Sequence, residues 1–347
     1  MSSSASSSLK TARRVVFPAI KRAEWETIPL PEPLGPNQVL IRTARTLVSA
    51  GTEIAIYSGT HIGYSTPGSR YPRIPFYPGY AYAGTVEAAG PEVTTVKPGD
   101  RVLGSMGHTD WTVVEAEGDR LDLIPDGVSF EQACLARLAA ISLQGVRLAR
   151  LSLGENVAVF GQGLIGQLAR QFCAIDGAAT VTAVDLIEPR LEIARQHGAT
   201  HTVNPSEDDL AAALSAITNG QGFDVCIEAT GNPAVIADAL HHAGRMARVI
   251  LLGSPRGRIE IDPYRDIHSK GVALIGAHAN TTASVPNAYH PWTVAQHRRF
   301  AMEMMRQGRL HTDGLISHTV PASDALPVWD ALMTHQADYM GVIIDWT

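Results

Sequence analysis

The sequence lacks any apolar run that approaches the roughly 20 residues needed to span a bilayer. Its start, MSSSASSSLKTARR, also lacks the apolar segment of a secretory signal. The three cysteines are widely spaced in apolar runs, which favours buried thiols in a reducing compartment over disulfides or a metal site. Positive charge is not in surplus, since 28 Lys and Arg stand against 34 Asp and Glu. We therefore expect a cytoplasmic protein that acts on a small molecule, with no nucleic-acid or membrane partner.

The first part of the chain, to about residue 135, has the pattern of a β-rich domain. Short apolar runs such as Val15–Ile20, Gln38–Arg42 and Gly84–Ala88 are separated by Gly and Pro turns. Closely spaced strands of this kind are typical of a partly open β-barrel. The stretch Tyr57–Tyr80 is rich in Gly, Pro, Tyr and Ser without clear periodicity, so we expect a functional loop there.

From Ser129 onward the pattern changes to alternating strands and helices. A helix is predicted over Phe130–Ala149, with Ser129 as its N-cap. Near-continuous apolar strands between helices indicate a parallel sheet covered on both faces, that is, a doubly wound α/β domain. The predicted strands are Val157–Phe160, Val181–Asp185, His201–Val203, Val225–Glu228, Arg248–Gly253 and Val272–Ile275. The predicted helices are Leu164–Ile175, Pro189–His197, Asp208–Thr218 and Ala234–His241, with a later one over Ala295–Arg309.

A glycine motif follows the first strand of that series. It has the context of a dinucleotide-binding fingerprint, because a strand precedes it, a helix follows it, and Asp185 ends the next strand. The first glycine permits the turn, the second lets the backbone approach a pyrophosphate, and the third lets the helix pack closely. The helix N-terminus attracts the diphosphate, and Asp185 would accept hydrogen bonds from the ribose. The motif is Gly161, Gln162, Gly163, Leu164, Ile165 and Gly166.

Asp185 also indicates which dinucleotide is used. Its carboxylate would repel a 2′-phosphate, and the next residue, Leu186, is apolar. The nearest cation is Arg190, which we place on the face of the following helix and count, with Leu186, among the candidate cofactor-binding residues. The sequence therefore favours NAD over NADP.

At this point the chain resembles the medium-chain dehydrogenase/reductase superfamily, whose members include zinc-dependent alcohol and polyol dehydrogenases. The resemblance rests on Pro98–Val102, Gly161–Gly166, Glu228–Asn232 and Leu252–Ser254, and runs like Ser49–Glu53 and Lys270–Gly276 bring it nearer the polyol, threonine and bacteriochlorophyllide dehydrogenases. It implies a GroES-like catalytic domain formed by residues 1–138 and 279–347. A Rossmann NAD-binding domain over residues 139–278 would be inserted between them.

The resemblance breaks at the zinc ligands. Relatives carry Cys, a Gly-His-Glu run, and a third Cys or Glu, whereas this chain has Ala50, Gly79-Tyr80-Ala81 and Arg137. No cysteine lies between Arg101 and Phe130, so the structural-zinc lobe is missing as well. Because zinc requires thiolate, imidazole or carboxylate, we predict an enzyme without zinc.

What the resemblance implies for catalysis is hydride transfer between the nicotinamide and a carbinol carbon. Thr52 matches the hydroxyl that binds the substrate alcohol. Tyr80 and Arg137 occupy lost ligand positions that converge in the family fold, so Tyr80 is one candidate for the base. His61, in the loop, or His108, at the pocket mouth, is the other candidate, and the sequence leaves the choice open. The residues expected near the nicotinamide end are Thr230, Gly231, Gly253, Ser254, Ala277 and His278.

Polar and aromatic residues among the expected pocket lining favour a sugar, cyclitol or sugar acid as substrate, although an aromatic or porphyrin-like one also fits. Two other functions remain open: a zinc-free quinone or enoyl reductase, and a non-catalytic NAD-binding protein. The strand Val272–Ile275 would be a bare apolar edge, so we expect a homodimer or homotetramer.

Overall fold

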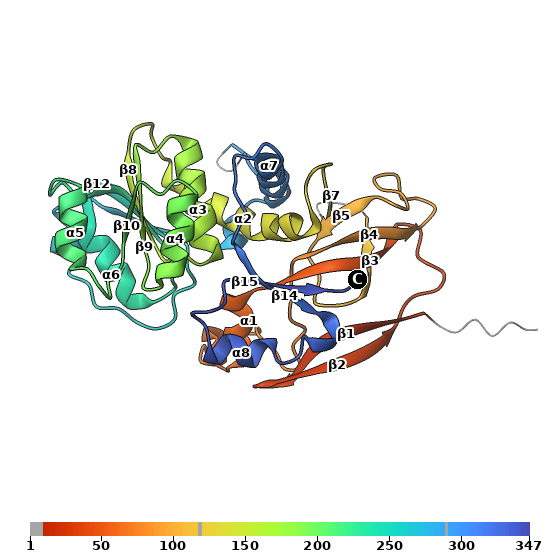
Figure 1. The fold of residues 1–347 in the computed structure, drawn as a ribbon. Helices are drawn as coiled ribbons and strands as arrows, with labels where there is room; N and C mark the ends of the chain where they lie inside the picture. The colour runs from red at the N-terminus through yellow and green to blue at the C-terminus, as the bar shows by residue number, and fades with distance from the viewer. Residues whose placement is uncertain (1–9, 117–119, 289–290) are drawn as a thin grey trace, which may run out of the picture. The chain divides into compact units, whose positions relative to one another are not determined.

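The computed structural model describes residues 10–116, 120–288 and 291–347 (Figure 1). Residue contacts divide the chain into two units. The first contains Met1–Leu135 and Ser317–Thr347, and the second contains Ala136–Ile316. Both chain ends thus belong to one unit. The contacts group residues 279–316 with the second unit, whereas the resemblance assigned them to the catalytic domain.

Two antiparallel sheets form the first unit. Strands β1 and β2 pair with each other, and the larger sheet has the order β14-β15-β3-β4-β5-β7, with β6 also paired to β3. Its core contains Trp329, Phe17 and Tyr57, which are fully buried. The strands are β1 (Thr11–Ala19), β2 (Arg22–Pro29), β3 (Gln38–Val48), β4 (Tyr82–Ala89), β5 (Arg101–Gly104), β6 (Trp111–Glu115), β7 (Leu121–Leu123), β14 (Ile316–Pro321) and β15 (Gly341–Asp345). The helices are α1 (Ala50–Tyr57), α8 (Val328–Thr334) and the short η1 (Ile62–Tyr64) and η4 (Ala322–Asp324).

A parallel six-stranded sheet forms the second unit. Its order is β10-β9-β8-β11-β12-β13, which in chain order reads 3-2-1-4-5-6, the order of a doubly wound dinucleotide-binding domain. The strands are β8 (Asn156–Phe160), β9 (Thr180–Val184), β10 (His201–Val203), β11 (Phe223–Glu228), β12 (Ala243–Leu251) and β13 (Ala273–Gly276). The helices are α3 (Leu164–Asp176), α4 (Glu188–Gln196), α5 (Leu210–Ile217), α6 (Pro233–His242), α7 (Val294–Arg306), the π-helical η2 (Pro263–His268) and η3 (Ala279–Thr281).

The fold class predicted from the sequence is confirmed. Helix α2 spans Phe130–Ala149 as expected, and Ser129 caps it: the Ser129 hydroxyl accepts the Gln132 N–H at 3.1 Å, and the Gln132 side chain accepts the Ser129 N–H at 2.9 Å. Strand β2 and helix α1 were not predicted. Among the described residues, no helix is long and apolar enough to cross a membrane.

Candidate cofactor edge and proton-transfer residues

The glycine loop between β8 and α3 has the geometry that its sequence predicts. Gly161 has φ +90°, a conformation that favours glycine. A Cβ on Gly166 would lie 1.8 Å from the Gly161 carbonyl oxygen, so only glycine permits this packing. A Cβ on Gly163, the N-cap of α3, would meet nothing within 4 Å. Open space therefore lies against the helix N-terminus, where a pyrophosphate would bind.

Asp185 is held in place by two backbone N–H groups. Its Oδ2 accepts the Gln162 N–H at 2.5 Å, and its Oδ1 accepts the Ile187 N–H at 2.9 Å. The Gln162 side chain is buried and donates to the Val159 carbonyl at 2.8 Å, which ties the glycine loop to strand β8. Each carboxylate oxygen keeps a lone pair for a ribose hydroxyl. These residues fit a dinucleotide.

Arg190 lies on helix α4 and is partly buried, while Leu186 is 65% exposed. Burial lowers the pKa of the Arg190 guanidinium, and the nearby Asp185 carboxylate counteracts this. The Arg190 guanidinium therefore interacts electrostatically with Asp185, the carboxylate that would contact the ribose.

Glu228, at the end of β11, organises the rim of the sheet near Thr230, Gly231 and Gly253. Its buried Oε1 accepts the N–H groups of Thr230 at 2.6 Å and Gly231 at 2.9 Å, and also the Thr230 hydroxyl. Burial raises the pKa of this carboxyl group. A Cβ on Gly253 would lie 2.3 Å from the Gly231 nitrogen, so the loops that follow β11 and β12 can approach this closely only with glycine at position 253. The sequence placed Glu228 at the end of an apolar strand, but it was not among the expected site residues.

The remaining expected cofactor residues follow the carboxyl ends of β12 and β13 or begin α3. Ser254 and His278 are exposed, and Ala277 is buried with its N–H donated to the Leu251 carbonyl at 3.0 Å. Leu164 is buried and Ile165 is half-buried. All of these residues belong to the second unit.

In the first unit, the Tyr80 hydroxyl lies 2.5 Å from the Ser49 hydroxyl. Ser49 is the N-cap residue of α1 and is only 7% exposed, while Tyr80 is half-buried. The Ser49 hydroxyl makes no capping hydrogen bond to the helix. Sequence reasoning singled out Tyr80 and missed this partner, because nothing in the sequence brings residues 31 positions apart together.

His108 is fully buried, so its expected position at a pocket mouth was wrong. Its Nε2 lies 3.1 Å from Glu53 Oε2, and its Nδ1 lies 2.8 Å from the Thr46 hydroxyl. The Trp346 indole N–H donates to the Thr46 oxygen, and the Trp329 indole N–H donates to Glu53 Oε2. A neutral His108 with its proton on Nε2 gives every one of these donors an acceptor. In that arrangement its Nδ1 is already occupied.

The other catalytic candidates occupy three different elements. Thr52 is half-buried within α1. His61 precedes η1, its Nδ1 accepts the Gly63 N–H at 3.0 Å, and its ring meets Tyr71 edge-on at 5.3 Å. Arg137 is half-buried in α2, in the part that belongs to the second unit.

The residues at the family's zinc positions do not fit zinc. Ala50 offers no ligand atom, and the Tyr80 phenol is engaged with Ser49. Throughout the part of the chain that the structure describes, no group of three or more His, Cys, Asp or Glu side chains could hold a metal ion.

The parallel sheet, the glycine loop and the held Asp185 together define a protein with a dinucleotide-binding domain. Residues 165–294 match the zinc-binding dehydrogenase family, and residues 35–127 match the alcohol dehydrogenase GroES-like domain. Sorbitol dehydrogenase from Bacillus subtilis (strain 168) is 30% identical over 259 residues, covering 66% of this chain and 71% of that protein. L-threonine 3-dehydrogenase from Photorhabdus laumondii is 29% identical over 354 residues, covering 92% and 95%.

A solved structure from Sinorhizobium meliloti 1021 that holds NADP superposes with a TM-score of 0.79 at 22% identity, covering 97% of this chain and 99% of that one. The chain belongs to the medium-chain dehydrogenase/reductase superfamily, and it is an oxidoreductase.

Proposed function

We propose that this enzyme is a zinc-independent, NAD-dependent dehydrogenase that acts on a secondary alcohol, or its ketone, in a polyhydroxylated substrate. The observation that carries the cofactor part is the Asp185 carboxylate, fixed by the Gln162 and Ile187 N–H groups beside the glycine loop. The substrate class is supported by the polar groups His61 and Tyr80, and by the relatives that are named for sorbitol and threonine. NAD, when bound, accepts a hydride from the carbinol carbon.

A residue of the protein must then accept the proton that the substrate hydroxyl loses. Tyr80 is the proposed base and Thr52 the proposed partner of the substrate hydroxyl. Ser49 supports this assignment, because its hydroxyl can donate to the Tyr80 oxygen once that oxygen carries negative charge. The buried, fully bonded ring of His108 argues against the histidine alternative at that position. His61 remains as a substrate contact.

The residues at the zinc positions support independence from zinc. Elemental analysis of the purified enzyme should find zinc well below one equivalent, and a chelator should leave its rate unchanged. These measurements belong with a screen of polyols, cyclitols and sugar acids that follows NADH absorbance. Stoichiometric zinc with chelator-sensitive turnover would refute the proposal. Intact NAD binding without turnover on the panel would favour a non-catalytic role, and reduction of enones or quinones would favour the reductase alternative.

The preference for NAD needs a separate test, because Arg190 lies in the field of Asp185. We expect kcat/KM to be higher with NAD than with NADP. Asp185→Ser should reduce that ratio, since it removes the charge that repels the 2′-phosphate and leaves Arg190 able to attract it. A wild-type enzyme that prefers NADP would overturn the cofactor assignment.

A further inference from the structure

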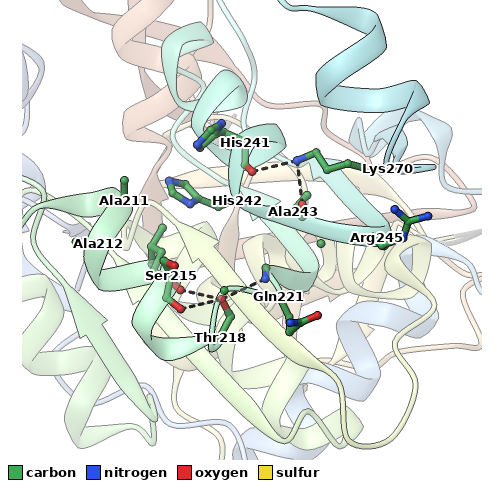
Figure 2. Close-up of a pocket in the computed structure, with 14 residues that line it drawn as sticks. Ala211, Ala212, Ser215, Thr218, Gln221, His241, His242, Ala243, Arg245 and Lys270 are labelled. Carbon is green, nitrogen blue, oxygen red and sulfur yellow. Dashed lines mark hydrogen bonds between the residues drawn. The ribbon is translucent and has the colours of Figure 1, made fainter.

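A depression of about 560 Å³ lies in the second unit, and Figure 2 shows the residues that line it. Gly222 directly precedes β11, and Ala243 and Gly244 begin β12, so the depression is at the amino-terminal ends of these parallel strands. The glycine loop follows the carboxyl end of β8, which is paired in parallel with β11. A six-residue strand such as β11 is roughly 20 Å long, and it separates the two places.

The ionisable side chains that line this depression are all basic. Arg245, Lys270, His241 and His242 contribute to it, and none of its 14 lining residues is Asp or Glu. The protein as a whole carries a formal net charge of −6, so this is a local reversal. Burial is the largest cause that lowers the pKa of His242 to about 4, and the neighbouring His241 and Lys270 contribute to the same shift.

Hydrogen bonds made by Lys270 and Thr218 fix the walls of the depression. Lys270 Nζ donates to the carbonyls of Leu240 at 2.7 Å, His241 at 3.0 Å and Ala243 at 3.0 Å, which closes the end of α6; Figure 2 shows the bonds to His241 and Ala243. All three N–H donors of the Lys270 ammonium group are therefore occupied by backbone carbonyls. Thr218 donates to the Leu214 carbonyl at 3.0 Å and accepts the Gly222 N–H at 3.2 Å. The walls are thus fixed before any ligand arrives.

Arg245 differs from these residues. It is exposed at the rim, and its guanidinium makes no hydrogen bond or ion pair with any residue that the structure describes. A guanidinium presents paired N–H donors that match the oxygens of a phosphate group. The Ser215 side chain lines the same depression from α5. The ammonium group of Lys270, the exposed guanidinium of Arg245 and the two imidazole rings therefore border the same depression.

We propose that this depression binds a small phosphorylated molecule, with Arg245 as its principal phosphate ligand. A phosphate monoester carries about −1.5 to −2 charges at pH 7, which is opposite in sign to the basic side chains Arg245 and Lys270. The volume lies within the range of about 300–1,000 Å³ common for ligand sites, so there is room for an organic group beyond the phosphate. This site does not depend on the proposed dehydrogenase activity.

The test is an NMR titration of the histidine ring C–H signals in the full-length protein. The probes are inorganic phosphate, glucose 6-phosphate and, as the uncharged control, glucose. We expect a saturable change with both phosphates and none with glucose. The His242 pKa should rise from about 4, because a bound anion stabilises the imidazolium. Tighter binding of glucose 6-phosphate than of inorganic phosphate would identify an organic phosphate as the ligand class, and equal binding would identify the phosphate group alone.

Two variants make the result specific. Arg245→Gln should weaken phosphate binding about tenfold or more, whereas Arg309→Gln, an exposed arginine of the same unit, should not. Ser215→Asp places a carboxylate in the hollow and should abolish binding while the fold is retained. The proposal is overturned if sodium chloride reproduces the phosphate response at equal ionic strength, or if Arg245→Gln binds phosphate like the wild type.

Discussion

The hydroxyl groups of Tyr80 and Ser49 lie 2.5 Å apart, and the backbone N–H of Ser49 makes a separate hydrogen bond. The Ser49 N–H donates to Glu53 Oε1 at 2.8 Å, and the residue is buried at the start of α1. The Ser49 hydroxyl is therefore directed at Tyr80 by the helix that it begins. This pair is the geometric basis of the proton-transfer proposal.

Removing the Tyr80 hydroxyl should remove the base. We expect Tyr80→Phe to lower kcat by about 10²–10⁴-fold, as is typical when a general base is lost, with the Kd for NAD unchanged. Steady-state kinetics and a fluorescence titration with NAD measure the two effects. Tyr77→Phe, at an exposed tyrosine three residues earlier, is the matched control and should keep the wild-type rate. Full activity in Tyr80→Phe would end the proposal for Tyr80.

Ser49→Ala should act on the same step through Tyr80. A phenolate that loses a hydrogen-bond donor is less stable, so the pKa of Tyr80 should rise, and the ascending limb of the kcat/KM profile, which reports the base, should move to higher pH. The helix itself should keep its stability, because the Ser49 hydroxyl makes no capping hydrogen bond. An unchanged pH profile would mean that Ser49 only fills space.

His108→Ala should destabilise the protein. The change leaves Glu53 without one of its buried partners and opens a cavity beside Trp329, whose ring centre is 5.6 Å from that of His108. Leaving a buried carboxylate without one of its hydrogen-bond donors costs about 1–3 kcal/mol, and the cavity adds to this, so urea unfolding should show a loss of at least that size. His61→Ala, at a half-buried loop position, should cost much less and should mainly raise KM. Wild-type stability in His108→Ala would contradict the buried network.

Two glycines of the cofactor loop should respond differently to the same added methyl group. Gly166→Ala places a Cβ 1.8 Å from the Gly161 oxygen, so we expect a lower Tm and no NAD binding. Gly163→Ala meets no protein atom within 4 Å, so its Tm should be that of the wild type. Its Kd for NAD should nevertheless rise at least about tenfold, because the methyl group occupies the approach of the pyrophosphate. Normal NAD binding by Gly163→Ala would refute this placement of the cofactor.

The sequence predicted the parts of this structure that depend on local pattern. The apolar strands, the capping box at Ser129 and the glycine fingerprint each follow from residues close together in the chain. It did not predict α1, because Ala50–Tyr57 is short and carries no clear helical periodicity. The position of His108 was missed for another reason. Its burial depends on Glu53 and Trp329, which are 55 and 221 residues away along the chain, and no local signal reports such contacts.

The last prediction concerns assembly, which we propose to be a homodimer or a dimer of dimers. Strand β13 pairs with β12 on one side only and forms the edge of the parallel sheet. Its apolar residues remain accessible, and Leu274 is 38% exposed. An edge strand with unpaired backbone groups and apolar side chains is a template for pairing with a second copy of itself. Light scattering at micromolar concentration should therefore report at least a dimer.

Leu274→Lys should shift the protein toward the monomer, because a charged side chain on an edge strand opposes edge-to-edge pairing. Leu153→Lys, which changes an 88% exposed leucine outside the strands, is the matched control and should leave the mass unchanged. If the wild-type protein is monomeric, the proposed assembly is wrong. A dimer that persists in Leu274→Lys would instead place the interface elsewhere on the protein.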